Sequence, residues 1–131
     1  MIVSTVRIAV GAKTREEVLS ILFSMRGPTE SEPGCISCRI YTEPRDQKHI
    51  TYEEVWRDEE GFHQHLRSAH YRNLLAAMDL SSEPPEVKFN TVSKTEGIEV
   101  VKRTLEKVDP ETMRWARATN RFSPLKQDPS R

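Results

Sequence analysis

The order of strand-like and helix-like segments constrains the fold of this chain more than any other feature. A β-branched run over Val3–Val10 precedes helical spacing over Arg15–Arg26, and the patterns then continue as strand, strand, helix and strand. These later segments are the runs Ile36–Glu43 and Ile50–Arg57, helical sequence after Asp58, and alternation at Val87, Phe89 and Thr91. The β-α-β-β-α-β order predicts an α+β, ferredoxin-like protomer, a four-stranded antiparallel sheet with helices on one face.

Local signals set the expected ends of these segments. Thr14 and Glu17 have the spacing of a capping box, and Gly27-Pro28 is expected to end the first helix. A polar loop of hairpin length joins the two middle strands, which are therefore expected to be antiparallel neighbours. Asp58 is expected to cap the helix that follows them, and Ser68 to cap a second helical piece.

Apolar side chains lie on both faces of the middle strands. Val55 alternates onto the face opposite Tyr52 and Trp56, and Tyr41 onto the face opposite Ile40. Helices can cover only one of these faces, and an exposed apolar sheet face is an association site. The pattern predicts a homodimer that forms through the sheet faces.

Size and charge exclude several classes of protein. The chain has 131 residues, 20 basic and 20 acidic, so it fits one compact domain and has no overall charge that would hold a polyanion. No apolar run approaches the ~20 residues of a membrane span, and the N-terminus lacks the pattern of a signal peptide. We expect a cytoplasmic protein that binds neither nucleic acid nor membrane.

The last part of the chain has a different composition. Residues 102–131 carry eight basic and four acidic residues, a net of plus four, and form a basic extension to a domain over residues 1–101. Gly97–Val101 is expected to be a further short strand that pairs with the partner subunit. Asp109-Pro110-Glu111 is a helix-start signal, and the aromatic face of that helix, with Trp115 and Phe122, is expected to dock on the domain before a mobile end over 124–131.

Two cysteines, Cys35 and Cys38, have a spacing that redox and zinc sites also use. They begin a strand, where side chains three apart point to opposite faces, and no second ligand pair for zinc follows at a usual spacing. They are expected to be free and buried, and no metal site is expected.

Three of the four histidines, His63, His65 and His70, fall within eight positions of helical sequence. They directly follow a strand that carries Glu54 and Trp56 on the same face as Tyr52. Because the unperturbed pKa of histidine lies near neutrality, such a cluster can perform acid–base chemistry or bind a ligand. Purely structural roles for the same residues remain open.

The stretches EPGCISCRIY, YEEVWRDEEGFHQHLRSAHYRNLL and PPEVKFNTV together resemble the antibiotic biosynthesis monooxygenase family, in the form of quinol-monooxygenase-like proteins of the dimeric α+β barrel superfamily. The resemblance covers residues 2–101. It implies a dimer joined sheet to sheet, a pocket between sheet and helices, and oxidation of phenols or hydroquinones by dioxygen without a metal, flavin or other cofactor. A general base would remove the phenolic proton, and the anion would then donate an electron to oxygen.

The resemblance also suggests roles for individual residues. His65 and His70 match the family's helical histidines and are the candidate catalytic residues, with His65 the first choice for the base. Tyr52, Glu54, Trp56 and Phe62 are the candidate substrate-binding residues, while His63 matches no family position. Two alternatives remain, a non-catalytic small-molecule-binding dimer and a haem-degrading protein. Haem-degrading relatives use an asparagine on the first strand, and the first strand of this chain, IVSTVRIAV, has none.

Overall fold

The computed structural model describes residues 1–107, 111 and 114 of the chain. The chain divides into two compact units, one over Met1–Val92 and another that begins at Ser93. The sequence predicted a domain over residues 1–101 followed by an extension over 102–131. The two units are treated separately below.

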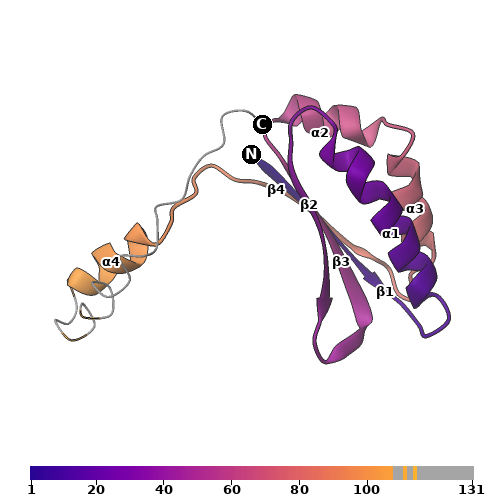
Figure 1. Cartoon of the computed structure of the whole chain (residues 1–131), viewed down its shortest axis with the longest axis horizontal. Coiled ribbons are helices and arrows are strands. Elements are labelled where there is room, and N and C mark those ends of the chain that lie inside the picture. Colours follow the sequence, from indigo (N-terminus) through magenta and orange to yellow (C-terminus); the bar gives the residue numbers. More distant parts are fainter. Residues whose placement is uncertain (108–110, 112–113, 115–131) are drawn as a thin grey trace. The chain divides into compact units, whose positions relative to one another are not determined.

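The first unit has the predicted order of elements (Figure 1). Its elements are β1 (Ile2–Ala9), α1 (Arg15–Glu30), β2 (Cys35–Glu43), β3 (Asp46–Trp56), α2 (Glu59–Leu66), α3 (Tyr71–Asp79) and β4 (Glu86–Thr91). The strands form one sheet in the order β2-β3-β1-β4, and every neighbouring pair is antiparallel. All three helices cover the same face of the sheet, so the predicted ferredoxin-like α+β fold is confirmed.

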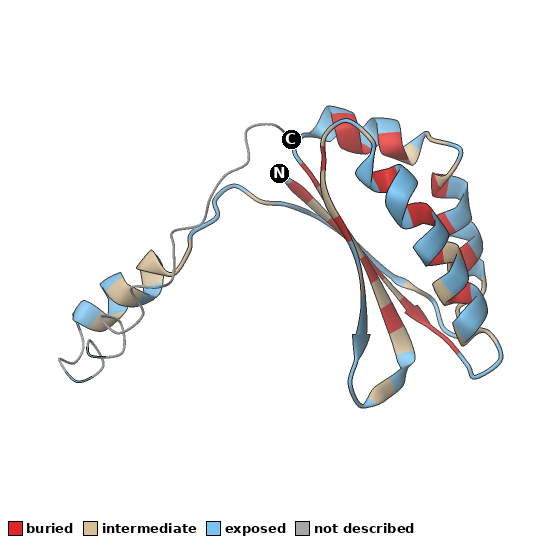
Figure 2. Cartoon of the chain, in the orientation of Figure 1, coloured by how far each residue is buried: buried red, intermediate tan, exposed pale blue. Residues whose placement is uncertain are grey.

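The core lies between the sheet and the helices (Figure 2). On β1 the side chains of Val6 and Ile8 are fully buried, and Arg7 between them is only partly buried. Helix α1 contributes Val18, Leu22 and Met25 at helical spacing. The side chains on the opposite face of the sheet are only half-buried in the single chain. A partner subunit, proposed below, would be needed to bury this second face.

Helix α1 is longer than the sequence predicted, because it continues through Gly27-Pro28 to Glu30. A proline inside a helix removes one backbone donor and costs about 3 kcal/mol. Thr29, however, lies one turn beyond Met25 on the buried face, and its hydroxyl lies 3.4 Å from the Tyr52 hydroxyl. Packing of this last turn offsets the cost of Pro28, and the expected end near Arg26 was wrong.

The helix-start predictions have mixed outcomes. Thr14 is the N-cap of α1, but its hydroxyl accepts from the Gly11 backbone and not from the helix, so the capping-box bonding was wrong. Asp58 caps α2 as predicted and accepts from the Gly61 N–H at 2.9 Å. The N-cap of α3 is His70 and not Ser68, although the Ser68 hydroxyl accepts from the Tyr71 N–H at 3.3 Å.

Both cysteines are buried, as predicted, and neither forms a disulfide within the described part of the chain. A β-bulge between Cys35 and Ser37 shifts the pairing of β2 with β3, so the strict alternation assumed from the sequence does not hold there. Cys35 packs beside Trp56, and Cys38 lies in the main core. The Cys38 thiol donates to the Tyr52 hydroxyl at 3.1 Å, and burial raises the pKa of Cys38 to about 11.

In the second unit, Gly97–Val101 is not a strand. It leads into the helix α4 (Glu99–Glu106), whose apolar residues Ile98, Val101 and Leu105 recur at helical spacing. The β-branched valines suggested a strand, but helical periodicity decides the structure because no strand of the described chain pairs with this segment. Glu111 and Arg114 are also helical. The predictions for Asp109-Pro110, for the aromatic face with Trp115 and Phe122, and for 124–131 lie outside the described residues.

We predict that Leu22→Ala lowers the free energy of unfolding by about 2–5 kcal/mol, because Leu22 is fully buried and its loss leaves a cavity. Urea unfolding followed by circular dichroism measures the effect. Phe23→Ala, at the next residue, is the matched control. The Phe23 side chain is 58% exposed, so this substitution should lower the free energy of unfolding by less than about 1 kcal/mol. Equal losses in the two variants would contradict the packing of α1 described above.

Candidate functional site

The candidate site is a chain of four ionisable side chains centred on His65. Alternation along β3 turns Glu54 and Trp56 toward the helices, and both are fully buried. His65 lies in the last turn of α2 and is also fully buried. His70 is the N-cap residue of α3, and Glu32 lies in the turn between α1 and β2.

Both ring nitrogens of His65 contact carboxylates. Its Nε2 lies 2.7 Å from Glu54 Oε2, and its Nδ1 lies 2.8 Å from Glu32 Oε2. The other oxygen of Glu54 accepts from the Trp56 indole N–H at 3.2 Å. Because an ionised carboxylate only accepts hydrogen bonds, His65 satisfies both partners only as an imidazolium with two N–H donors.

The electrostatics agree with this protonation state. Burial works to lower the pKa of His65, but the hydrogen bonds and charges of Glu54 and Glu32 outweigh it and raise the pKa above its ordinary value. The ring is held between Trp56, with centroids 4.7 Å apart, and the edge of Tyr71 at 5.2 Å. His65 is therefore a fixed and charged group within the fold.

Glu32 extends the chain of contacts toward the surface. Its Oε1 lies 2.6 Å from His70 Nε2, although the ring N–H is not aligned as a hydrogen bond. His70 Nε2 is buried, yet 25% of the His70 side chain is exposed, and Glu32 is 18% exposed. His70 is thus the most accessible of the four groups.

Two glycines allow Glu32 to reach α2. Gly34 has a φ of 88°, which lets the chain turn sharply after Pro33. A Cβ on Gly61, in α2, would lie 3.0 Å from the Pro33 carbonyl oxygen, so only glycine lets the helix approach this turn so closely. Sequence reasoning missed Glu32, because nothing in the local sequence indicates its contact with a histidine 33 positions away.

The other predicted site residues lie around this chain of contacts. Tyr52 is fully buried, and its hydroxyl contacts Cys38 and Thr29, not the histidines. Phe62 packs beside Trp56, and its ring lies 5.1 Å from that of Phe89, which is 49% exposed on β4. His63 is exposed on α2 and takes no part in the network.

Glu32, His65 and His70 could in principle hold a metal ion, since each offers a ligand atom and these atoms lie within 4.8 Å of one another. Two imidazoles and a carboxylate are a donor set that zinc or iron accepts. The contacts of 2.6 and 2.8 Å between Glu32 and the two rings are, however, shorter than the roughly 3.3 Å that separates ligands around tetrahedral zinc. The side chains as they lie fit protons better than a cation.

Because the pKa of His65 is raised in the folded state, its ion pairs stabilise the fold fully below about pH 6.5 and lose that contribution as pH rises through the folded pKa. We predict that the free energy of unfolding falls as pH rises above about 6.5, measured by urea unfolding at each pH. His65→Gln should remove most of this slope, while the exposed His63→Gln should keep it. A slope unchanged in His65→Gln would contradict the charged state of His65.

Comparison with known proteins gives the family. The model of the antibiotic biosynthesis monooxygenase family matches residues 1–77, more than half of the chain. An uncharacterized protein of Synechocystis, sll1783, is 27% identical over 83 residues, which are 63% of this chain and 56% of that protein. The chain therefore spans little more than half the length of this curated relative.

Solved structures share the fold. Rv0793 from Mycobacterium tuberculosis is 25% identical with a TM-score of 0.65, over 72% of this chain and 96% of that one. A conserved protein from Methanosarcina mazei is 24% identical with a TM-score of 0.64, over 68% and 89%. A variant of SnoaB, a cofactor-independent oxygenase from Streptomyces nogalater, is 19% identical with a TM-score of 0.62, over 72% and 94%.

Every helix in the described part of the chain is too short or too polar to span a bilayer. The matched residues 1–77 include β1 to β3 and all the members of the His65 network. The chain belongs to the antibiotic biosynthesis monooxygenase family.

Proposed function

We propose that the protein is a cofactor-independent monooxygenase that oxidises a phenolic or quinol-type aromatic small molecule with dioxygen. The single observation that carries the proposal is the partly exposed His70 backed by a buried network of carboxylates and imidazolium. Such an arrangement can take a proton from a bound phenol, and family membership supplies the oxygenase chemistry.

In the proposed reaction the substrate supplies all four electrons that reduce dioxygen. A base removes the phenolic proton, and the electron-rich anion transfers an electron to oxygen within the protein. One oxygen atom enters the ring and the other leaves as water, so a hydroquinone would be released as a hydroxyquinone. Exclusion of bulk water keeps the radical pair together and limits side reactions.

The predicted site residues divide by exposure. His70 would contact the substrate, and the fully buried His65 would support His70 from inside the fold. Glu54 would fix the His65 ring, with Trp56 holding Glu54 in turn. The aromatic edge of Phe62 beside the exposed Phe89 is a surface on which a flat aromatic substrate can pack. Tyr52 would support the site from the core.

We predict that the metal-free protein consumes dioxygen with at least one compound in a panel of hydroquinones and polycyclic phenols, followed with an oxygen electrode. His65→Ala and His70→Ala should each lower the rate at least about 100-fold, since general base catalysis contributes that much. His63→Ala is the matched control and should keep the wild-type rate, because His63 lies outside the network. EDTA should have no effect; loss of uptake on chelation, or full activity in both His65→Ala and His70→Ala, would contradict the proposal.

A second candidate function is a non-catalytic dimer that binds a small molecule. The observation that favours it is the complete burial of Glu54, Trp56 and His65, which a purely structural role would also explain. Absence of uptake above autoxidation on every compound, with ligand binding retained, would support this candidate instead.

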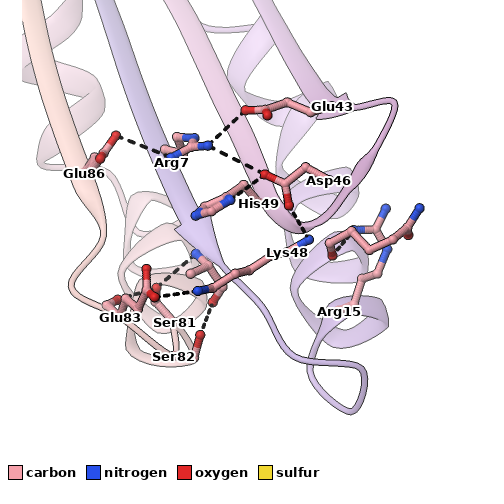
Figure 3. Close-up of polar contacts among 12 residues, drawn as sticks. Arg7, Arg15, Glu43, Asp46, Lys48, His49, Ser81, Ser82, Glu83 and Glu86 are labelled. Atoms are coloured by element: carbon pink, nitrogen blue, oxygen red, sulfur yellow. Dashed lines mark hydrogen bonds and ion pairs between the residues drawn. The ribbon is translucent and has the colours of Figure 1, made fainter.

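We further propose a homodimer that forms through the sheet face opposite the helices. Val3 and Val55 are cross-strand partners on this face and are only half-buried in the single chain. At the hairpin end of the face, Arg7 contacts Glu43, Asp46 and Glu86 (Figure 3). An apolar patch bordered by charged groups is typical of a surface that associates with a partner subunit.

We also propose a cytoplasmic location, which would keep the thiols of Cys35 and Cys38 reduced.

Sedimentation should give twice the chain mass of 15.1 kDa at micromolar concentration. Val55→Glu should raise the dimer dissociation constant at least about tenfold, because it would bury an unpaired charge at the interface. Phe23→Glu makes the same change on the exposed surface of α1 and should leave the dimer intact. If the unmodified protein sediments as a monomer, the dimer proposal is wrong.

A further inference from the structure

We propose that Glu32 is a positioning residue that couples His70 to the buried pair His65–Glu54, so that the four groups accept one proton as a unit. This inference rests on the proposed function, because it assigns the part that Glu32 plays in removing the substrate proton. Glu32 lies in the turn between α1 and β2, outside the segment 52–70 that carries all the predicted site residues.

The contacts form an unbroken path from the core to the surface. Glu54 Oε2 lies 2.7 Å from His65 Nε2, and His65 Nδ1 lies 2.8 Å from Glu32 Oε2. Glu32 Oε1 then lies 2.6 Å from His70 Nε2. The two oxygens of Glu32 therefore face two different rings, one buried and one partly exposed, and no other described carboxylate contacts both.

The charges of these groups set how many protons they hold. His65 needs both N–H donors to satisfy its two carboxylates, so Glu32, His65 and Glu54 together carry a net charge of minus one. Tyr71, whose edge faces His65, stays neutral because burial and the Glu54 charge raise its pKa, and the Trp56 donor is neutral. A proton on His70 brings the whole group to zero charge, which a buried site favours.

The geometry also selects the reacting nitrogen. His70 Nε2 is buried against Glu32, so Nδ1 is the nitrogen left to receive the substrate proton. The phenolic O–H bond breaks as the Nδ1–H bond forms, and the electron pair stays on the substrate oxygen. The proton later passes to reduced oxygen, which leaves as water.

The role of Glu32 resembles that of the carboxylate that contacts the catalytic histidine in serine proteases. It orients the ring and stabilises the imidazolium without becoming protonated itself. The His70 N–H is not aligned with Glu32 in the substrate-free chain, a state common for catalytic hydrogen bonds before substrate binds. The contact with His65 Nδ1 fixes Glu32 in place.

Glu32→Gln tests the inference, with Glu30→Gln as the matched control. Glu30 lies two residues earlier and forms an ion pair with Arg26 at the surface. In Glu32→Gln we expect kcat to fall roughly 10- to 100-fold with KM changed less than about twofold, and the lower-pH midpoint of the kcat profile to move to lower pH. Glu32→Asp should recover part of the loss, and Glu30→Gln should behave as the unmodified protein. Full activity in Glu32→Gln would overturn the inference.

A second measurement separates this inference from the proposed function. NMR titration of the His70 ring protons should show a lower midpoint in Glu32→Gln than in the unmodified protein, and no change in Glu30→Gln. That result without any oxygen uptake would support the coupling and overturn the monooxygenase proposal. Oxygen uptake with an unchanged His70 titration would leave the proposed function standing and overturn the role of Glu32.

Discussion

The hydrogen bonds from both nitrogens of His65 join three parts of the fold that are distant in the sequence. One bond reaches Glu54 on the central strand β3, and the other reaches Glu32 in the turn after α1. The ring itself packs against Trp56 and Tyr71. The position of α2 on the sheet, the approach of the turn to that helix, and the exposure of His70 at the start of α3 all depend on this one buried ring.

An arrangement of this kind has a cost in stability. Burying charged groups costs several kcal/mol for each ion, and a well-packed apolar cluster of similar volume is often as stable or more so. Stability alone therefore gives no reason for two carboxylates around a buried imidazolium. Perturbed, buried ionisable groups beside an accessible one are instead typical of sites where protons move. The proposed oxygenase chemistry uses this property, because the substrate becomes reactive toward dioxygen only after it loses a proton.

Much of the fold was predictable from the sequence, because hydrophobic period and turn residues are local signals. The order of elements, the hairpin, the Asp58 cap and the shared face of Glu54 and Trp56 follow from such signals. The failures came where tertiary contacts decide: α1 continues through Pro28 because Thr29 packs in the core, and the segment from Gly97 is helical despite its valines. Glu32 could not be predicted, because its contact with His65 depends on how closely the turn approaches α2.

The protonation state of His65 is the central claim, and nitrogen NMR of the labelled imidazoles measures it directly. We predict that both His65 nitrogens still carry protons at pH 6.5, the ordinary pKa of histidine, because each nitrogen faces a carboxylate and the pKa of His65 is raised. A His65 ring that has lost one of these protons at or below pH 6.5 would contradict the network described here and the charge count built on it.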